Sequence, residues 1–322
     1  MQDSLPVHGC SVSAPARLHL GFLDLNGSLG RRYGSIGLAL DAPATEIDVR
    51  RATTEGAAGP EHERVLTVLR RCCEALGLPG PYHVTVKRAI PAHAGLGSGT
   101  QLALSIGLAL TRLEGLAFSP QQIGDLAGRG ARSAIGMAAF ETGGFIVDGG
   151  RGTRDQPPPV LIQTSFPEAW RCLLVCDPSD QGAHGDRETR AFATLPPFPE
   201  PLANRLCRLV LMQLVPGLKE EDLSAFGAAL SEIQAIVGGH FSAAQGGHPW
   251  TSPAVGALLE RARELGATGI GQTSWGPTGF GFVPDQDVAD SLYHSLVGDA
   301  KAKGLEIAIV RGRNTGATVA TG

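Results

Sequence analysis

The sequence predicts an α+β fold in two halves, and three observations lead to this expectation. The chain has 322 residues, which is enough for two buried cores. About 43% of the residues are hydrophobic and 18% are charged, a balance typical of a globular protein. Strand-like and helical apolar patterns occur in both halves, and the proline-rich run at 155–160 separates them. We expect the boundary within 155–185, with domains over 1–165 and 166–322.

The first half combines short strands with apolar helices. Alternating apolar residues predict strands at 17–23, 36–40, 46–50 and 82–87. Apolar residues at helical spacing predict helices at 61–76, where Gly77 follows as a stop, and at 100–113. Ser119, Pro120 and Gln122 fit the N-cap, first and third positions of a further helix.

The second half repeats this mixture of elements. The patterns predict strands at 171–176, 269–274, 279–283 and 305–311, and one more strand at 161–164, just before the expected boundary at 165/166. They predict helices at 201–214, 220–237, 252–265 and 286–302. The polar run at 177–188 is expected to be a loop.

Composition excludes several classes of partner. The formal net charge is −4 and the basic residues are scattered singly or in pairs, so we expect no nucleic-acid partner. No run reaches the roughly 18 apolar residues of a membrane helix, and the N-terminus lacks the pattern of a signal peptide. The six cysteines form no CxxC pair, which favours buried thiols in a reducing compartment. We therefore expect a cytoplasmic enzyme without a membrane partner.

The run PAHAGLGSGT is the most informative stretch. Three glycines, Gly95, Gly97 and Gly99, directly precede an amphipathic helix, whose first N–H groups lie at the positive end of the helix dipole. Ser98 adds a hydroxyl for a phosphate or for Mg²⁺. The run matches neither GxxxxGK[ST] nor GxGxxG. It predicts a phosphate-binding loop, and the alternative is a glycine-rich turn without a ligand. The expected phosphate contacts are His93, Gly95, Leu96, Gly97, Ser98, Gly99 and Thr100.

Residues 90–101 resemble the PxxxGLGSS loop of the GHMP kinase superfamily, which includes galactokinase, homoserine kinase and mevalonate kinase. In that superfamily the loop wraps the triphosphate of ATP, and its serine helps to hold Mg²⁺. The resemblance implies these roles for Gly95, Gly97 and Ser98, and Gly99 replaces the second serine of the motif.

The catalytic base of those kinases has no counterpart here. The kinases usually carry an aspartate seven or eight residues before a Gly-Gly pair, where it accepts the proton of the substrate hydroxyl. The pair in this chain is Gly143-Gly144, and no acid occurs between Arg132 and Phe140. Glu141 lies too close to the pair to match. The sequence therefore predicts the superfamily's fold with a different chemistry.

Four segments together resemble the β-ribofuranosylaminobenzene 5′-phosphate synthase family: 15–40, 90–104, 128–150 and 271–282. The resemblance implies a two-domain GHMP-kinase-like fold, with a ribosomal protein S5 domain 2-like N-terminal half and a ferredoxin-like C-terminal half. It also implies a magnesium-dependent homodimer that condenses phosphoribosyl pyrophosphate with p-aminobenzoate or 4-hydroxybenzoate. Such enzymes release CO₂ and pyrophosphate in the tetrahydromethanopterin biosynthesis of methanogens and methylotrophic bacteria. The alternatives are an ATP-dependent small-molecule kinase and a non-catalytic ligand-binding relative.

Polar residues near the first strand are candidates for catalysis. Arg17 and His19 share one strand face, and Asp24 follows in the next loop. His19 or Asp24 is expected to assist proton movement or to orient the aryl acid, and the alternative is a solvent-facing role. Asn26 and Arg31 are substrate-binding candidates, although an exposed arginine pair with Arg32 explains Arg31 equally well.

Further candidates come from elsewhere in the chain. One arginine of 129–133 is expected to contact a phosphate, and we assign Arg132. Trp275 is expected to stack on the aromatic substrate or else to lie in the core. The metal candidate is Ser98. A magnesium ligand in the polar run at 177–188 is a weaker alternative to a plain loop there, and its candidates are Asp177, His184, Asp186 and Glu188.

Overall fold

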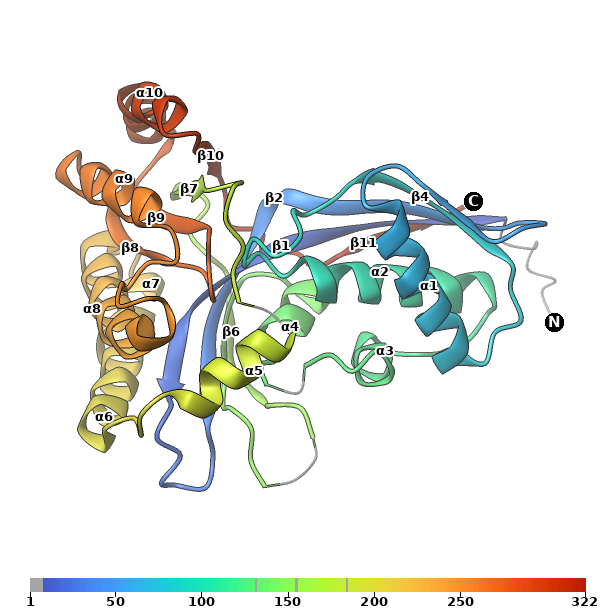
Figure 1. Cartoon of the computed structure of the whole chain (residues 1–322), viewed down its shortest axis with the longest axis horizontal. Coiled ribbons are helices and arrows are strands. Elements are labelled where there is room, and N and C mark those ends of the chain that lie inside the picture. The colour runs from blue at the N-terminus through green and yellow to red at the C-terminus, as the bar shows by residue number, and fades with distance from the viewer. Residues whose placement is uncertain (1–7, 131, 154–155, 184) are drawn as a thin grey trace.

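The computed structural model describes residues 8–130, 132–153, 156–183 and 185–322. Within these ranges the chain forms two β-sheets, each with helices packed against it (Figure 1). The predicted α+β class is confirmed. In the part of the chain that the structure describes, no helix combines the length and apolar character needed to cross a membrane.

The first sheet is built on two long antiparallel strands, β1 (Gly9–Asp24) and β2 (Tyr33–Arg51). The other strands are β3 (Gly56–Ala58), β4 (Tyr82–Arg88), β5 (Phe145–Asp148), β6 (Val160–Thr164) and β11 (Thr318–Thr321). The order is β11–β1–β2–β4–β3, and β5 pairs with both β2 and β6. The separate strands expected at 36–40 and 46–50 are wrong, because β2 continues through both and only shifts its register opposite Pro15 and Ala16.

The helices of the first half pack around α2 (Ser98–Leu113), which follows the glycine loop. The others are α1 (His62–Leu76), α3 (Pro120–Leu126) and α4 (Ile135–Glu141), and α2 contacts all three as well as β1 and β2. The predicted cap of α3 is confirmed, since Ser119 Oγ accepts from the Gln122 N–H at 3.2 Å and Gln122 Oε1 accepts from the Ser119 N–H at 2.9 Å. Nearly every side chain of α2 is buried, which fixes the loop at its N-terminus.

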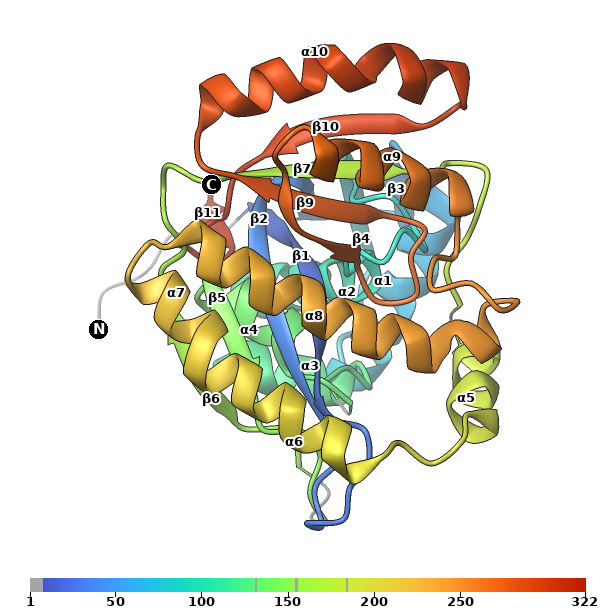
Figure 2. The ribbon, with the colours of Figure 1, turned by 90° about the vertical axis from the view of Figure 1, so that its left-hand side faces the viewer.

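The second sheet has the order β10–β7–β9–β8. Its strands are β7 (Arg171–Cys176), β8 (Thr268–Gln272), β9 (Gly279–Val283) and β10 (Glu306–Val310). Helix α8 (Leu223–Phe241) lies on one face, while α9 (Pro253–Glu264) and α10 (Gln286–Ala302) cover the other (Figure 2). Along the chain, β7 is followed by several helices, then by β8 and β9, and then by α10 and β10. This order of elements is the ferredoxin-like arrangement that was expected.

The segment before α8 contains the helix expected at 201–214 and two further helices that the sequence did not predict. It forms α5 (Gly185–Thr194), α6 (Glu200–Leu209), the π-helical turn η1 (Val210–Leu214) and α7 (Val215–Lys219), and the short 3₁₀ turn η2 (Ser242–Ala244) follows α8. The loop expected at 177–188 is therefore wrong in its last part, where α5 begins. In the view of Figure 1, α5 runs diagonally across the front of the molecule.

The chain crosses between the halves more than once. The second sheet starts at Arg171, a few residues after the expected boundary at 165/166. The last strand, β11, returns to the first sheet and pairs with β1 from Cys10↔Thr321 to Ser13↔Thr318. Residues 318–321 therefore belong structurally with the N-terminal half, although the expected second domain ran to residue 322.

Candidate functional site

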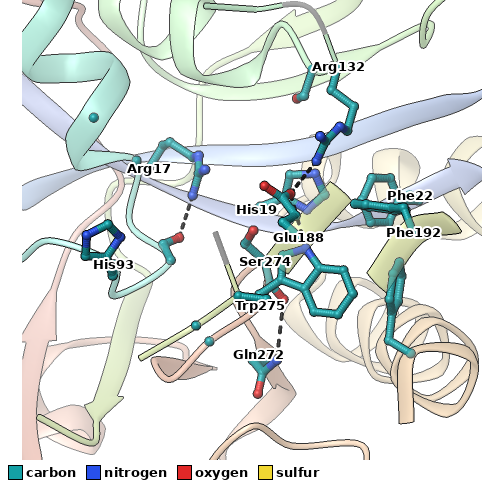
Figure 3. A pocket seen from close by; sticks show the side chains of 18 of the residues that line it. Arg17, His19, Phe22, His93, Arg132, Glu188, Phe192, Gln272, Ser274 and Trp275 are labelled. Carbon is teal, nitrogen blue, oxygen red and sulfur yellow. Dashed lines mark hydrogen bonds and ion pairs between the residues drawn. The ribbon is translucent and has the colours of Figure 1, made fainter. Parts of the chain in front are cut away.

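A cavity of about 680 Å³ lies where the glycine loop, β1, α5, α8 and the β8–β9 loop meet. Elements from both halves of the chain line it (Figure 3). One end is formed by the N-terminus of α2 and several arginines, and the other end is formed by aromatic rings. The two ends have different chemistry and are described in turn.

The glycine loop presents the N-terminus of α2 to the cavity. Gly97 is the N-cap with φ 86°, and no side chain caps the helix. The first N–H groups of a helix have no partner within it, so those of Ser98 and Gly99 are placed to bind an anion. The glycine loop is hydrogen-bonded to β1, because the Arg17 N–H donates to the Leu96 carbonyl at 3.0 Å.

Two arginines, Arg64 from α1 and Arg129 from the segment after α3, surround this N-terminus. A Cβ atom placed on Gly99 would lie 3.4 Å from Nη2 of Arg64 and 3.5 Å from Nη1 of Arg129. Nη2 of Arg64 also donates to Ser98 Oγ at 3.2 Å. The missing side chain at Gly99 thus leaves space between two guanidinium groups.

Arg129 is poorly satisfied within the described chain. Its Nε atom is buried and has no hydrogen-bond partner among the described residues. Burial lowers the pKa of Arg129, and the like charges of Arg64 and Arg71 lower it further. The Nη atoms of Arg129 lie beside Gly99, and an anion bound there would supply a countercharge to this guanidinium group.

Arg17 extends the cationic end along β1. Its Nη1 donates to the Gly95 carbonyl at 2.5 Å, and its stem passes beside Gly97. Burial lowers the pKa of Arg17 to about 10, which leaves the guanidinium protonated at neutral pH. A Cβ atom on Gly97 would first meet Cγ of Arg17, at 3.0 Å.

His19 lies two residues further along the same strand face. Its backbone N–H donates to Thr273 Oγ1 at 2.9 Å, and its ring centroid lies 4.6 Å from that of Phe22. Burial lowers the pKa of His19 to about 3, and the nearby Arg17 contributes in the same direction. The imidazole is therefore neutral across the physiological range, which makes it a weak base.

The opposite end of the cavity is an aromatic box. Five rings line it: Phe22, Tyr33, Phe192, Phe241 and Trp275. The Phe192 and Trp275 centroids are 5.4 Å apart and nearly perpendicular, and the Phe241 and Trp275 centroids are 4.7 Å apart. Tyr33 and Phe192 are separated by 5.7 Å. Edge-to-face packing of this kind builds a rigid apolar wall.

Glu188 of α5 lies between the two ends. Its Oε1 accepts a hydrogen bond from Trp275 Nε1 at 3.2 Å and forms an ion pair with Nη1 of Arg132 (Figure 3). The Arg132 guanidinium carbon also lies 4.8 Å from the Phe192 ring centroid. Among the described residues that line the cavity, Glu188 is the only carboxylate, and the same cavity is lined by five arginines: Arg17, Arg64, Arg129, Arg132 and Arg151.

Most of the predicted site residues meet in this cavity. Lining residues that the sequence predicted are Arg17, His19, His93, Gly95, Gly97, Ser98, Gly99, Thr100, Arg132 and Trp275. His93 is exposed on the loop, where its carbonyl accepts from the Gly182 N–H at 3.2 Å. Leu96 does not line the cavity, because its side chain is buried in the core. Trp275 is both a wall of the cavity and a buried side chain.

Asp24, Asn26 and Arg31 lie outside the cavity, and their expected catalytic and binding roles are not supported by its geometry. Asp24 lies five residues beyond His19, which corresponds to about 16 Å along a strand. Its Oδ1 accepts from the backbone N–H groups of Asn26 and Gly27, which forms a turn. Asn26 donates to the Phe198 carbonyl at 2.6 Å, and Arg31 donates to the carbonyls of Gly149 and Gly150. These three residues hold the β1–β2 loop in shape.

The weaker metal candidates are also dispersed. Asp177 accepts from Ser179 and from Ser252 Oγ and does not line the cavity. His184 and the side chain of Asp186 lie outside the described part of the structure. Of the two side chains of this group that the structure describes, Glu188 reaches the cavity and Asp177 does not.

The residues near Gly97 fit a magnesium ion only together with a phosphorylated ligand. The described residues include no group of three or more His, Cys, Asp or Glu that could hold a metal. Mg²⁺ is, however, often bound through few protein oxygens and several substrate phosphate oxygens. Ser98 Oγ accepts one hydrogen bond from Arg64 and keeps a second lone pair for such an ion.

Sequence reasoning missed Arg64 and most of the aromatic box. The alternation of β1 places Arg17 and His19 on one face, but the register shifts between His19 and Gly21. This bulge brings Phe22 to the cavity, although a strict period of two would have turned it away. Arg64 gives no local signal, since it lies on a helix more than 30 residues before Ser98.

Family models match both halves of the chain. Residues 63–144 match the GHMP kinases N terminal domain, and residues 214–301 match the GHMP kinases C terminal domain. The solved homoserine kinase of Cytophaga hutchinsonii superposes with a TM-score of 0.69 at 18% identity, covering 99% of this chain and 100% of that one. At this identity the likeness shows the fold alone, and it confirms the predicted GHMP-kinase-like fold.

Two archaeal relatives are similar over nearly their whole length. The β-ribofuranosylphenol 5′-phosphate synthase of Methanothermobacter thermautotrophicus is 31% identical, over 95% of this chain and 97% of the relative. The protein of the same name from Archaeoglobus fulgidus is 33% identical, over 96% of this chain and 98% of the relative. These findings confirm the resemblance carried by the four segments. The chain therefore belongs to the GHMP kinase superfamily and, within it, to the family of the β-ribofuranosylphenol 5′-phosphate synthases.

Proposed function

We propose that this protein condenses phosphoribosyl pyrophosphate with a 4-substituted benzoate, releasing CO₂ and pyrophosphate, as a step in tetrahydromethanopterin biosynthesis. The benzoate is p-aminobenzoate or 4-hydroxybenzoate. The observation that carries the proposal is a single cavity with a cationic end at α2 and an aromatic end at Trp275. One substrate of this reaction is a polyanion, and the other is a flat aromatic acid.

The cationic end fits the pyrophosphate group. The N–H groups of Ser98 and Gly99 and the guanidinium groups of Arg64 and Arg129 converge on the space beside Gly99. Negative charge gathers on the leaving pyrophosphate in the transition state, and fixed donors at that point lower the barrier. Mg²⁺ bound to the phosphates and to Ser98 would add a Lewis acid at the same place.

The aromatic end fits the benzoate ring. The walls formed by Phe192, Phe241 and Trp275 are rigid and apolar, and Arg132 lies beside Phe192. A guanidinium group in this position can pair with the carboxylate of the acid while the ring contacts the aromatic wall. The neutral imidazole of His19, next to Phe22, adds a further flat surface.

The proposed reaction needs no general base. The ring carbon that bears the carboxylate forms a bond to C1 of the ribose as the bond from C1 to the pyrophosphate oxygen breaks. The bond to the carboxylate then breaks, CO₂ leaves, and its electron pair restores the aromatic ring. No proton is removed from either substrate. This agrees with a lowered pKa at His19 and with the absence of an acid from the segment that carries the kinase aspartate.

The two archaeal relatives are named for a ribofuranosylphenol product, which favours 4-hydroxybenzoate for this chain. Both aryl acids are to be tested, each labelled at the carboxylate, with phosphoribosyl pyrophosphate and Mg²⁺. We expect CO₂ and pyrophosphate in equal amounts with at least one of the acids. A parallel incubation with ATP and small alcohols is expected to give no phosphorylated product. ATP turnover that depends on an alcohol, without CO₂ release in the first incubation, would refute the proposal.

A further inference from the structure

Glu188 is an unexpected group in a cavity built for anions. Both substrates of the proposed reaction are negatively charged, and five arginines line the cavity. A carboxylate among them repels each substrate and weakens binding. Its presence is explained only if it holds neighbouring groups in place or meets a positive charge that appears during the reaction.

The position of Glu188 favours the second explanation. The residue lies between the α2 end of the cavity and the aromatic box (Figure 3). Trp275 Nε1 donates to its Oε1, and Arg132 pairs with the same oxygen. Both contacts come from the cavity wall and fix the orientation of the carboxylate. Arg17 lies on the side of the glycine loop. It is close enough to Glu188 that the negative charge of this carboxylate raises the pKa of Arg17.

We propose that Glu188 is a catalytic residue whose carboxylate faces the ribose C1 and stabilises the positive charge that develops there as pyrophosphate departs. This inference rests on the proposed function. When pyrophosphate is held at the N-terminus of α2 and the aryl ring in the aromatic box, C1 must lie between them. Breaking its bond to pyrophosphate leaves an oxocarbenium-like centre, and carboxylates stabilise such centres in glycoside hydrolysis. Glu188 forms no bond to C1. The ring carbon that bears the carboxylate supplies the electron pair for the new bond to C1.

The decisive variant is Glu188→Gln, because glutamine keeps an oxygen acceptor for Trp275 and Arg132 and removes only the charge. We expect kcat to fall roughly 100-fold or more, the size of the loss when one group that stabilises transition-state charge is removed. Inorganic pyrophosphate should bind at least as tightly as to the wild type, since a repulsive charge is gone. Glu232→Gln is the control, because Glu232 pairs with Arg205 on the exposed surface of α8. It should leave kcat and pyrophosphate binding unchanged.

A purely structural role for Glu188 predicts different results. Wild-type kcat in Glu188→Gln would overturn the inference, because the hydrogen bonds alone would then suffice. A loss of kcat accompanied by weaker pyrophosphate binding or a lower urea midpoint would also overturn it, because the cavity itself would have changed. Failure of the wild type to release CO₂ would instead refute the proposed function, so the two claims fail separately.

Discussion

Ser98 stands where α2 meets the cavity, and its hydroxyl accepts from Arg64 at 3.2 Å. Replacing it with alanine removes one oxygen from the place where we expect pyrophosphate and Mg²⁺. We predict that Ser98→Ala lowers kcat roughly 10- to 1000-fold, which corresponds to about 1.4–4 kcal/mol of transition-state stabilisation. The matched control is Ser105→Ala on the same helix, because the Ser105 hydroxyl is buried and has no partner among the described residues. Equal activity of both variants in the CO₂ assay would contradict the assignment.

His19 makes stability depend on pH in a defined direction. Its pKa is about 3 in the folded chain and 6.5 in the unfolded one, so between these values only the unfolded chain binds the proton. The resulting stability is complete above pH 6.5 and is lost as the pH falls toward 3. We expect acidification from pH 7 to pH 5 to cost about 2 kcal/mol through this group.

Urea unfolding of the wild type and of His19→Asn at both pH values isolates this effect. The wild type should lose about 2 kcal/mol more on acidification than the variant does. The same loss in both proteins would show that His19 is protonated in the folded chain. In that case its role as a neutral surface beside the aryl ring would have to be abandoned.

At the scale of elements, the glycine loop is shaped by its backbone conformation and by its packing against Arg17. Gly97 has φ 86°, and a Cβ atom there would lie 3.0 Å from Cγ of Arg17. Gly115, at the other end of α2, has φ 64° but has nothing within 4 Å of an added Cβ atom. Alanine at either position pays about 1–2 kcal/mol for the left-handed conformation.

We therefore predict different outcomes for the two alanine variants. Gly115→Ala should lose stability in urea unfolding and keep its kcat. Gly97→Ala should lose a similar stability and, in addition, at least tenfold in kcat/KM for phosphoribosyl pyrophosphate, because Arg17 is displaced. A Gly97 variant with full activity would discredit the loop as the phosphate site.

Elements with local signals could be predicted from the sequence. The helix that follows the glycine loop and the capping box of Ser119 depend on a few neighbouring residues, and both predictions are confirmed. Helix α5 could not be predicted, because its sequence is polar and only a few residues such as Phe192 pack against the core. The site depends on such distant elements. Arg64 and Glu188 enter it only because α1 and α5 are folded against the ends of other elements.

At the scale of the whole molecule, the aromatic box joins the two halves. Phe22 and Tyr33 come from the first sheet, whereas Phe192, Phe241 and Trp275 come from the second half. We predict that Phe192→Leu raises KM for the aryl acid roughly 2- to 12-fold, the effect of losing about 0.5–1.5 kcal/mol of aromatic contact. KM for phosphoribosyl pyrophosphate should not change.

Phe118→Leu is the control for this variant, because Phe118 packs against the separate core around α1 and α2. It should leave both KM values unchanged. If Phe192→Leu affected phosphoribosyl pyrophosphate instead of the aryl acid, the two ends of the cavity would have been assigned the wrong way round.

The division of the cavity into an anionic-ligand end and an aromatic end depends on where pyrophosphate binds. A crystal structure of the protein with inorganic pyrophosphate and Mg²⁺ would locate it. We predict that its oxygens accept hydrogen bonds from the N–H groups of Ser98 and Gly99 and from the guanidinium groups of Arg64 and Arg129. Pyrophosphate bound elsewhere, with the space beside Gly99 left without it, would contradict the proposed chemistry.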